Sequence, residues 1–513
     1  MADIEINDLT SYGVIRDVEA HQLPPEAFSF GENIRFCAEG VERIGGQAQI
    51  FGTPGVAPHF TLPVQSASQT FWLYVSLTKG YVWDGSAHTN ITRQTAAVDV
   101  NYTGSFTREW NGTLLGGVPI LNNGVDPPQY WATLSTATKL AALANWPAST
   151  TAKVLRAFGP YLLALNVTKS GTIYPHMVKW SHPADPGSVP SSWDNTDSTK
   201  DAGENDLPDV QAGTIQDGLP LGNRFFVYKE GSVWRMTQIG GQFIFDFGTS
   251  AFIETAGLLT ARALAITGDG TRHVFASQDD ILVHNGNDVE SVLSERYKRY
   301  LFNAIDSTNY KNCFMYTDPY NNEVVFCYPE SGQTNPNRAL IWNYRIGKKG
   351  CISEREINFR NAAVGNIESA SADVWSGVAG TWNSYLGPWQ QQIRRRLVAC
   401  NTDATQFQQM ESGSTFAGTA FTATLQREDV AVIGRKRTGE WIEDFKRHRM
   451  VTRTWIKATG APISVRLGSR SVDGGRQPGV RWQPSLLERI ASWTLLSKVQ
   501  RSQSSFPPLN PSG

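Results

Sequence analysis

Six acidic side chains crowd into one polar stretch and are the first candidates for chemistry. Carboxylate oxygens are ligands that Ca²⁺ prefers, so such a stretch could hold that ion. The order of the acids does not follow the D-x-[DN]-x-[DN]-G pattern of a calcium loop. We therefore expect a solvated loop rather than a metal site. The six residues are Asp194, Asp197, Asp201, Glu204, Asp206 and Asp209.

Two histidines, His176 and His182, flank Trp180 and could be considered as metal ligands. Their spacing matches no common ligand pattern. Pro175 and Pro183 stand next to them and favour a loop. We expect structural histidines, and neither a metal nor an organic cofactor.

Catalytic motifs are absent from the sequence. It contains no GxSxG, HExxH or P-loop pattern. Residues 471–475 (SVDGG) resemble the start of a sialidase Asp-box, but the Thr-Trp ending is missing and no second copy follows. A glycosidase needs two carboxylates across one pocket, and nothing in the sequence selects such a pair. We expect that the chain is not an enzyme.

The strongest charge feature is a basic stretch near the C-terminal end. Glu440, Glu443 and Asp444 interrupt it, so it can be a solvated strand face. The alternative is a docking surface, because Arg makes bidentate pairs with carboxylates of a partner. Residues 394–396 (RRR) allow the same two interpretations. The candidate interface residues are Arg435, Lys436, Arg437, Lys446, Arg447 and Arg449.

The balance of charged residues argues against one class of partner, nucleic acid. The 513 residues contain 46 Lys and Arg against 47 Asp and Glu, a formal net charge of −1, so general affinity for nucleic acid is not expected. The start, MADIEINDL, lacks the basic and apolar regions of a signal peptide, and no apolar run is long enough for a membrane helix. These features predict a chain made in the cytoplasm without stable membrane insertion. Five dispersed cysteines indicate buried apolar residues rather than a disulfide framework.

The elements that must position these residues are short strands. Apolar or alternating runs recur, each followed by a Gly, Asn or Asp turn and a returning run. The pairs fall at 71–76 with 81–83, 161–167 with 178–180, 224–228 with 232–234, 273–277 with 281–284, and 323–328 with 339–344. A further unit includes 374–375 and 397–400. The Trp residues at strand ends suit core packing better than sugar platforms.

A spacing of roughly 40–55 residues between returning strands is typical of propeller blades. We predict an all-β protein with a β-propeller of six or seven blades over 65–430; a series of β-sandwiches is the competing architecture. Residues 1–64 are expected to form an N-terminal arm with one hairpin. Residues 431–500 are expected to form a smaller β region, with a strand pair at 454–457 and 463–467, and 501–513 a flexible tail.

The order of several short segments resembles the tail nozzle (hub) proteins of short-tailed bacteriophages, also called packaged-DNA stabilisation proteins. The N-terminal segments are 23–27 (LPPEA), 33–36 (NIRF) and 40–43 (GVER). The central ones are 174–194, 227–234 (VYKEGSVW) with 239–245, and 318–344. Trp375, 380–382 (GTW) and 425–428 (LQRE) complete the series. The resemblance covers most of 20–470 and rests on order, since each segment is short.

This resemblance implies a virion structural protein. Six copies would form a tube below the portal and adaptor proteins, retain DNA and then conduct it during ejection without sequence-specific binding, and anchor tail fibres or spikes. The basic stretch then becomes a candidate subunit or adaptor interface. The alternative is a receptor-binding adhesin or a glycan-cleaving propeller of a phage tail, which would need a pocket on one face of the propeller.

Overall fold

The computed structural model describes residues 9–16, 22–24, 26–38, 40–66, 69–106, 109–241, 243–346, 351–368, 393–401, 405–427, 433–435 and 441–443. The chain divides into two compact units. One unit is Ile6–Glu428, and the other combines Met1–Glu5 with Asp429–Gly513.

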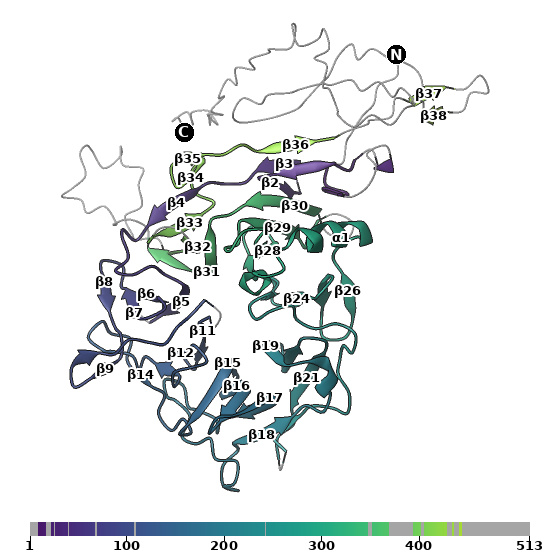
Figure 1. The fold of residues 1–513 in the computed structure, drawn as a ribbon. Coiled ribbons are helices and arrows are strands. Elements are labelled where there is room, and N and C mark those ends of the chain that lie inside the picture. Colours follow the sequence, from purple (N-terminus) through teal and green to yellow (C-terminus); the bar gives the residue numbers. More distant parts are fainter. Residues whose placement is uncertain are drawn as a thin grey trace, which may run out of the picture. The chain divides into compact units, whose positions relative to one another are not determined.

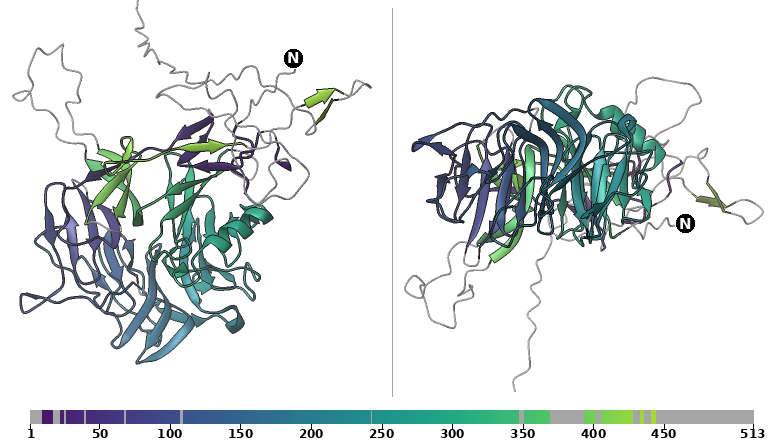
Figure 2. Two further views of the ribbon diagram at one scale, coloured as in Figure 1. Left: turned by 45° about the horizontal axis from the view of Figure 1, so that its top comes forward. Right: turned by 90° about the horizontal axis from the view of Figure 1, so that it is seen from below.

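The unit Ile6–Glu428 is a β-propeller of seven blades, which follow one another around a ring (Figure 1, Figure 2). This confirms the predicted fold class and excludes the β-sandwich series. Each of the first five blades is an antiparallel sheet of four strands in sequence order. Blade 1 is β5 (Phe60–Gln65), β6 (Thr70–Val75), β7 (Gly80–Trp83) and β8 (His88–Asn90); blade 2 is β11 (Asn111–Leu115), β12 (Val118–Asn122), β13 (Gln129–Tyr130) and β14 (Ala141–Ala142).

Blades 3 to 5 continue the pattern. Blade 3 is β15 (Thr150–Phe158), β16 (Tyr161–Lys169), β17 (Thr172–Trp180) and β18 (Gly203–Asp206). Blade 4 is β19 (Ile215–Leu221), β20 (Arg224–Lys229), β21 (Val233–Gln238) and β22 (Phe245–Asp246). Blade 5 is β23 (Leu264–Ile266), β24 (His273–Ala276), β25 (Ile281–His284) and β26 (Val289–Ser291). The hairpins predicted at 71–83, 161–180, 224–234 and 273–284 all lie in these blades.

Blades 6 and 7 have six strands each, because segments from both ends of the unit join them. Blade 6 has the order β27 (Phe314–Asp318), β28 (Glu323–Tyr328), β29 (Arg338–Asn343), β30 (Cys351–Glu356), β1 (Phe30–Glu32) and β36 (Thr424–Gln426). Blade 7 has the order β31 (Phe359–Glu368), β32 (Ile393–Asn401), β33 (Phe407–Met410), β4 (Gln47–Ile50), β34 (Thr415–Phe416) and β35 (Thr419–Ala420).

The ring closes through the N-terminal segment. β4 pairs antiparallel with β33, with Ile50 opposite Phe407 and Gln47 opposite Met410. The expected boundary at 64/65 therefore falls inside β5, and part of the expected arm is the fourth strand of blade 7. The expected hairpin at the N-terminal end is β2 (Ile34–Cys37) with β3 (Gly40–Arg43).

The strands are apolar on both faces because each blade lies between two others. In β6, Trp72 and Tyr74 pack toward Phe407 of blade 7, whereas Phe71 and Leu73 pack toward blade 2. In β16, alternate residues likewise enter two different clusters. Trp72 of β6, Trp131 directly after β13 and Trp234 of β21 lie in these cores with at most 2% exposure.

Helix α1 (Glu295–Ala304) follows blade 5 and was not predicted. Ser294 caps it by accepting a hydrogen bond from the Tyr297 N–H. Tyr297 and Leu301, four residues apart, form its buried face. No helix in the described part of the chain has the length and hydropathy of a membrane span.

The remaining elements are small. They are the hairpin β9 (Gln94–Thr95) with β10 (Val98–Asp99), the 3₁₀ turns η2 (Val210–Ala212) and η3 (Tyr310–Asn312), and the hairpin β37 (Ile433–Arg435) with β38 (Trp441–Glu443) in the second unit. The strands expected at 454–457 and 463–467, residues 374–375 and the tail 501–513 lie outside the described residues.

Candidate functional site: the propeller axis

The acidic side chains of blade 3 do not converge on one point. Asp194 accepts from the N–H and hydroxyl of Thr196, and Asp197 does the same with Thr199. Glu204 pairs with both Lys169 and Lys179, and Asp201 supplies its backbone carbonyl to the Trp180 indole. Among the described residues, no group of three or more His, Cys, Asp or Glu side chains is placed to hold a metal ion.

Asp209 belongs to a separate buried cluster. Its carboxylate accepts from the Lys229 ammonium, the Ser232 hydroxyl and, at 2.8 Å, the Trp234 indole. These contacts hold the pKa of Asp209 below its usual value, although burial acts against them. The cluster ties the loop before blade 4 to β20 and β21, which is a structural role.

The two candidate histidines have different surroundings. The His182 Nδ1 accepts from the Asp201 N–H at 3.1 Å. His176 lies in β17, with its Nδ1 buried and without a hydrogen-bond partner among the described residues. The structure does not bring the two rings together with a third ligand.

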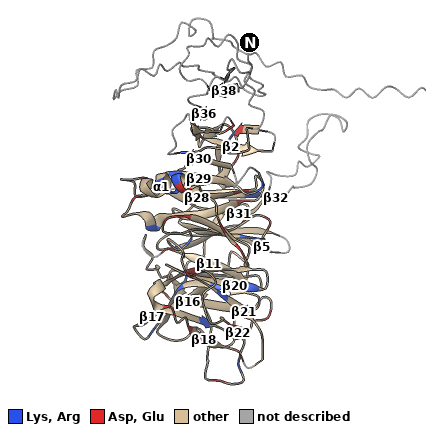
Figure 3. Ribbon diagram, turned by 90° about the vertical axis from the view of Figure 1, so that its right-hand side faces the viewer, with Lys and Arg blue, Asp and Glu red and all other residues tan. Residues whose placement is uncertain are grey.

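Most of the basic stretch lies outside the described residues, namely Lys436, Arg437, Lys446, Arg447 and Arg449. Arg435 is placed only by its backbone, at the end of β37 opposite Trp441. In β32, the guanidinium of Arg396 lies 5.7 Å from the Tyr320 ring centroid, and Arg395 is exposed. In the view of Figure 3, basic and acidic residues are scattered along the blades.

Sequence reasoning missed a cluster at the propeller axis. It gathers where the innermost strands begin, and every blade or the loop leading into it contributes a polar side chain. Each comes from within a few residues of the start of an innermost strand. In blade order they are His59, Glu109, Lys153 with Arg156, Gln216 with Asp217, Arg262, Lys311 and Arg360.

Ion pairs link several of these blades, one of them across the axis. The Arg262 guanidinium pairs with Glu109 and also donates to the carbonyl of Arg360 at 3.2 Å. Arg156 pairs with Asp217 at 2.8 Å. The Arg262 N–H in turn donates to the Asp217 carboxylate at 3.4 Å, so the two pairs form one network. A network that spans several blades restrains their relative positions at this end of the ring.

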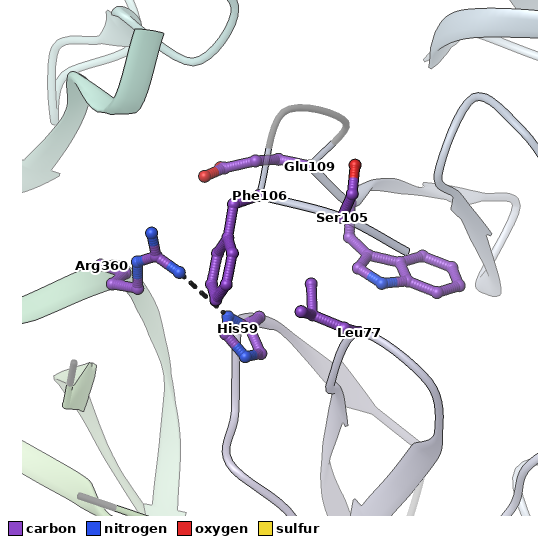
Figure 4. A pocket seen from close by; sticks show the side chains of 7 residues that line it. His59, Leu77, Ser105, Phe106, Glu109 and Arg360 are labelled. Carbon is purple, nitrogen blue, oxygen red and sulfur yellow. Dashed lines mark hydrogen bonds between the residues drawn. The ribbon is translucent and has the colours of Figure 1, made fainter. Parts of the chain in front are cut away.

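A small hollow lies on one side of this network. Its volume is about 10 Å³, room for about one water molecule. Figure 4 shows side chains from blades 1 and 7 and from the loop before blade 2 facing this space, with the Arg360 guanidinium at 3.3 Å from the His59 Nδ1. The lining residues are His59, Leu77, Ser105, Phe106, Glu109, Trp110 and Arg360.

Arg360 is positioned by stacking. Its guanidinium carbon lies 4.3 Å from the centroid of the Phe106 ring, which is 51% exposed. Burial, with Arg360 and Arg262 nearby, lowers the pKa of His59 to about 4. His59 is therefore neutral near pH 7 and can accept a hydrogen bond from Arg360.

A second interior feature connects blades 4 and 5. The Gly286 N–H donates to the His284 Nδ1 at 3.2 Å, and the His284 Nε2 lies 2.6 Å from the Tyr228 hydroxyl. That hydroxyl lies 2.8 Å from the His273 Nδ1, and the His273 Nε2 lies 3.1 Å from the carbonyl of Pro220. One set of neutral tautomers satisfies all four contacts, with each ring donating through its Nε2–H.

Comparisons with known proteins identify the fold of the chain but not its function. No protein-family profile matches the chain, and no curated protein matches it. Many solved structures match the chain. One is PorZ, an essential bacterial surface component of the type-IX secretion system of Porphyromonas gingivalis, at 11% identity and TM-score 0.35 over 76% of this chain. The chain spans only 40% of PorZ.

Two further matches have similar values. The WD40 β-propeller domain of Doa1 is 9% identical with TM-score 0.37, covering 72% of this chain and 95% of that domain. The β-propeller domain of Cps50 (Swd1) from Myceliophteria thermophila is 9% identical with TM-score 0.38, covering 70% of this chain and 98% of that domain. At such low identities and TM-scores, the functions of the matched proteins say nothing about the function of this chain. The likeness is limited to the β-propeller fold.

Proposed function

We propose that the chain is a virion structural protein, the subunit of a homohexameric tail nozzle in a short-tailed bacteriophage. In this proposal six propellers surround an axial channel below the portal and adaptor proteins. The channel retains DNA and conducts it during ejection. Exposed loops hold fibres or spikes, and no bond is made or broken by the chain.

The observation that carries the proposal is the order of the segments that resemble nozzle proteins. Two of the N-terminal segments, 33–36 and 40–43, lie at β2 and β3, which pack onto blade 6. The central segments form strands of blades 3, 4 and 6. In chain order, these segments therefore lie along one propeller.

Physical properties of the chain are consistent with a conduit. A closed ring of blades is rigid because every blade packs on two neighbours and few strand edges are left. A formal net charge of −1 limits non-specific adhesion of DNA, whose binding depends on releasing counterions from phosphates. A head-to-tail interface that repeats until it closes gives a ring.

The mass of the purified chain tests the proposal, measured alone and mixed with the portal and adaptor proteins of the same phage. We expect a species of six copies, formed alone or on the adaptor. Arg447→Gln with Arg449→Gln should weaken this assembly if the basic stretch is the interface. Arg296→Gln removes an exposed cation from α1 and serves as the matched control. A stable monomer that binds or cleaves glycans would contradict the proposal.

A further inference from the structure

Polar side chains are buried where blades 6 and 7 pack against each other. Gln408 is 0% exposed, Gln47 1% and Arg355 2%. Among the described residues, no hydrogen-bond partner exists for the oxygen or the nitrogen of either amide, or for the Nε and Nη2 atoms of Arg355. A buried polar atom without a partner costs free energy, so such atoms usually meet ordered water or a ligand.

The strand registers place these three side chains on the two surfaces that face each other. Residues that are directly paired on neighbouring strands lie on the same face of a sheet. The paired neighbours of the three side chains all belong to the apolar cluster between the two blades. They are Ala339 for Arg355, Ala399 for Gln408 and Met410 for Gln47. The polar side chains therefore point into the seam between blades 6 and 7.

The guanidinium of Arg355 reaches across this seam toward Gln47. Gln47 lies between Met410 of β33 and Phe416 of β34 in its sheet. The Arg355 guanidinium carbon is 5.9 Å from the centroid of the Phe416 ring. Its Nη1 is 3.6 Å from the carboxylate of Glu411, the residue after Met410. One edge of the guanidinium thus faces a carboxylate, while the Nε and Nη2 atoms at the other edge are the ones without a partner in the described part of the chain.

Gln408 and Tyr316 complete the group. Gln408 lies opposite Gln49 in β4, which makes it the diagonal neighbour of Gln47. The Tyr316 hydroxyl of blade 6 is buried and has no hydrogen-bond partner among the described residues. Burial raises the pKa of Tyr316 and the charge of Arg355 opposes that rise, so the two side chains are near each other. The group offers seven polar atoms in all, from both blades.

We infer that the seam between blades 6 and 7 binds a small cluster of buried water. An internal water makes about three hydrogen bonds, so about two or three molecules satisfy the seven atoms. A water can accept from Arg355 and donate to an amide oxygen of Gln47 or Gln408, which joins the two blades. Gln47 belongs to β4, so this water connects the strand that closes the ring to blade 6.

The charges of the seam favour water over an ion. The guanidinium of Arg355 repels a metal cation. Arg35 and Arg355 already face the carboxylates of Glu323 and Glu411, which leaves no positive excess for an anion. The inference rests on the packing of the blades and does not depend on the proposed place of the chain in a tail.

A crystal structure that resolves ordered water tests the inference directly. Water is expected within hydrogen-bond distance of the Nε or Nη2 of Arg355 and of the amide of Gln47 or Gln408. Direct hydrogen bonds among these side chains, with no water between them, would overturn the inference. An ion in the seam would overturn it as well.

A substitution tests the same inference in solution by the sign of its effect. Gln47→Met keeps the length of the side chain and removes the amide. If water satisfies this amide, the equilibrium constant for unfolding should rise about tenfold, because hydrogen bonds are lost. If the amide is dry and has no partner, the substitution should stabilise the protein instead. Urea unfolding at pH 7 measures the change.

Gln49→Met is the matched control, because Gln49 lies in the same strand and is exposed. It should change the equilibrium constant by less than about threefold. A stabilised Gln47→Met variant, or equal effects of the two substitutions, would contradict bound water in the seam.

Discussion

Tyr228 is the residue on which the contact between blades 4 and 5 depends. Its hydroxyl is buried between the rings of His273 and His284, and each contact requires one ring nitrogen in one protonation state. Burial lowers the pKa of His273 to about 4 and that of His284 to about 3. Other charges nearby are Asp217, which faces Tyr228, and Arg224, which donates to the carbonyl of Gly286.

This chain of hydrogen bonds predicts a pH dependence of stability. Because the folded pKa values lie below the ordinary 6.5, the unfolded chain takes up protons first as the pH falls. The contribution of the pair is complete above about pH 6.5 and declines as the pH falls toward 4. Urea unfolding between pH 8 and pH 4 measures this contribution. The wild type is compared with the double variant His273→Gln, His284→Gln.

The comparison with the variant is needed because Glu323 acts in the opposite direction. Burial raises its pKa to about 7, so its own contribution grows as the pH falls. Glu323 is present in both proteins and cancels in the difference. If the free energy of unfolding depended on pH in the same way in both proteins, the pKa values of the two histidines would not be lowered by folding. That result would contradict the prediction.

At the scale of elements, one buried arginine connects the β2–β3 hairpin to blades 6 and 7. The Arg35 guanidinium contacts both carboxylate oxygens of Glu323, at 3.0 and 3.2 Å. It also contacts Glu411 at 2.8 Å, and Glu411 in turn accepts from the Gly45 N–H. The arrangement satisfies charges that would otherwise be costly to bury.

Replacing Arg35 with Met should destabilise the propeller by about 3–5 kcal/mol, because the buried Glu323 loses its ion-pair partner and Glu411 keeps only the longer contact with Arg355, at 3.6 Å. Combining it with Glu323→Gln should recover part of the loss, since one of the stranded charges is removed. Urea unfolding of the single and double variants gives the coupling. Additive losses in the double variant would contradict the account of the network.

Because β4 closes the ring of blades, a substitution that disrupts β4 should destabilise the propeller. Ala48 lies in the middle of β4, opposite Gln409 of β33. Proline there removes a ladder hydrogen bond and clashes with the sheet, so Ala48→Pro should lower the stability by about 3 kcal/mol or more. Thr95→Pro, in the exposed β9–β10 hairpin, is the control and should have little effect. Equal melting temperatures for the two variants would contradict the closure.

Local sequence patterns predicted the strands but not all their partners. The apolar runs of β6 and β16 identify strands because both faces of a blade are buried. Helix α1 was missed because only Tyr297 and Leu301 mark its buried face. The pairing of β4 with β33 joins segments some 360 residues apart, and no local pattern encodes such a partner.

At the scale of the whole molecule, the fold class was predicted and the axial cluster was not. Its members are polar or charged residues spread along the chain from His59 to Arg360, and they form no motif. Their common property is a position near the start of an innermost strand. This shared position can be recognised only after the blades are aligned with each other. Such an alignment needs the first residue of each innermost strand, which sequence patterns do not locate accurately.

Some candidate site residues chosen from the sequence do not form a site in the structure. The acids of blade 3 were the first candidates for a site, but threonines and lysines of the same blade occupy them. The basic stretch stays a predicted interface, since only the backbone of Arg435 is placed. The proposed assembly therefore depends on the order of segments along the propeller, and its subunit count on the resemblance.

Electron microscopy of the proposed virion tests the central claim most directly. Particles should show six copies of the propeller around an open axial channel, directly below the portal and adaptor rings, with DNA entering from above. A particle in which the chain is located at the tip of a fibre, or is absent from the tail axis, would contradict the account.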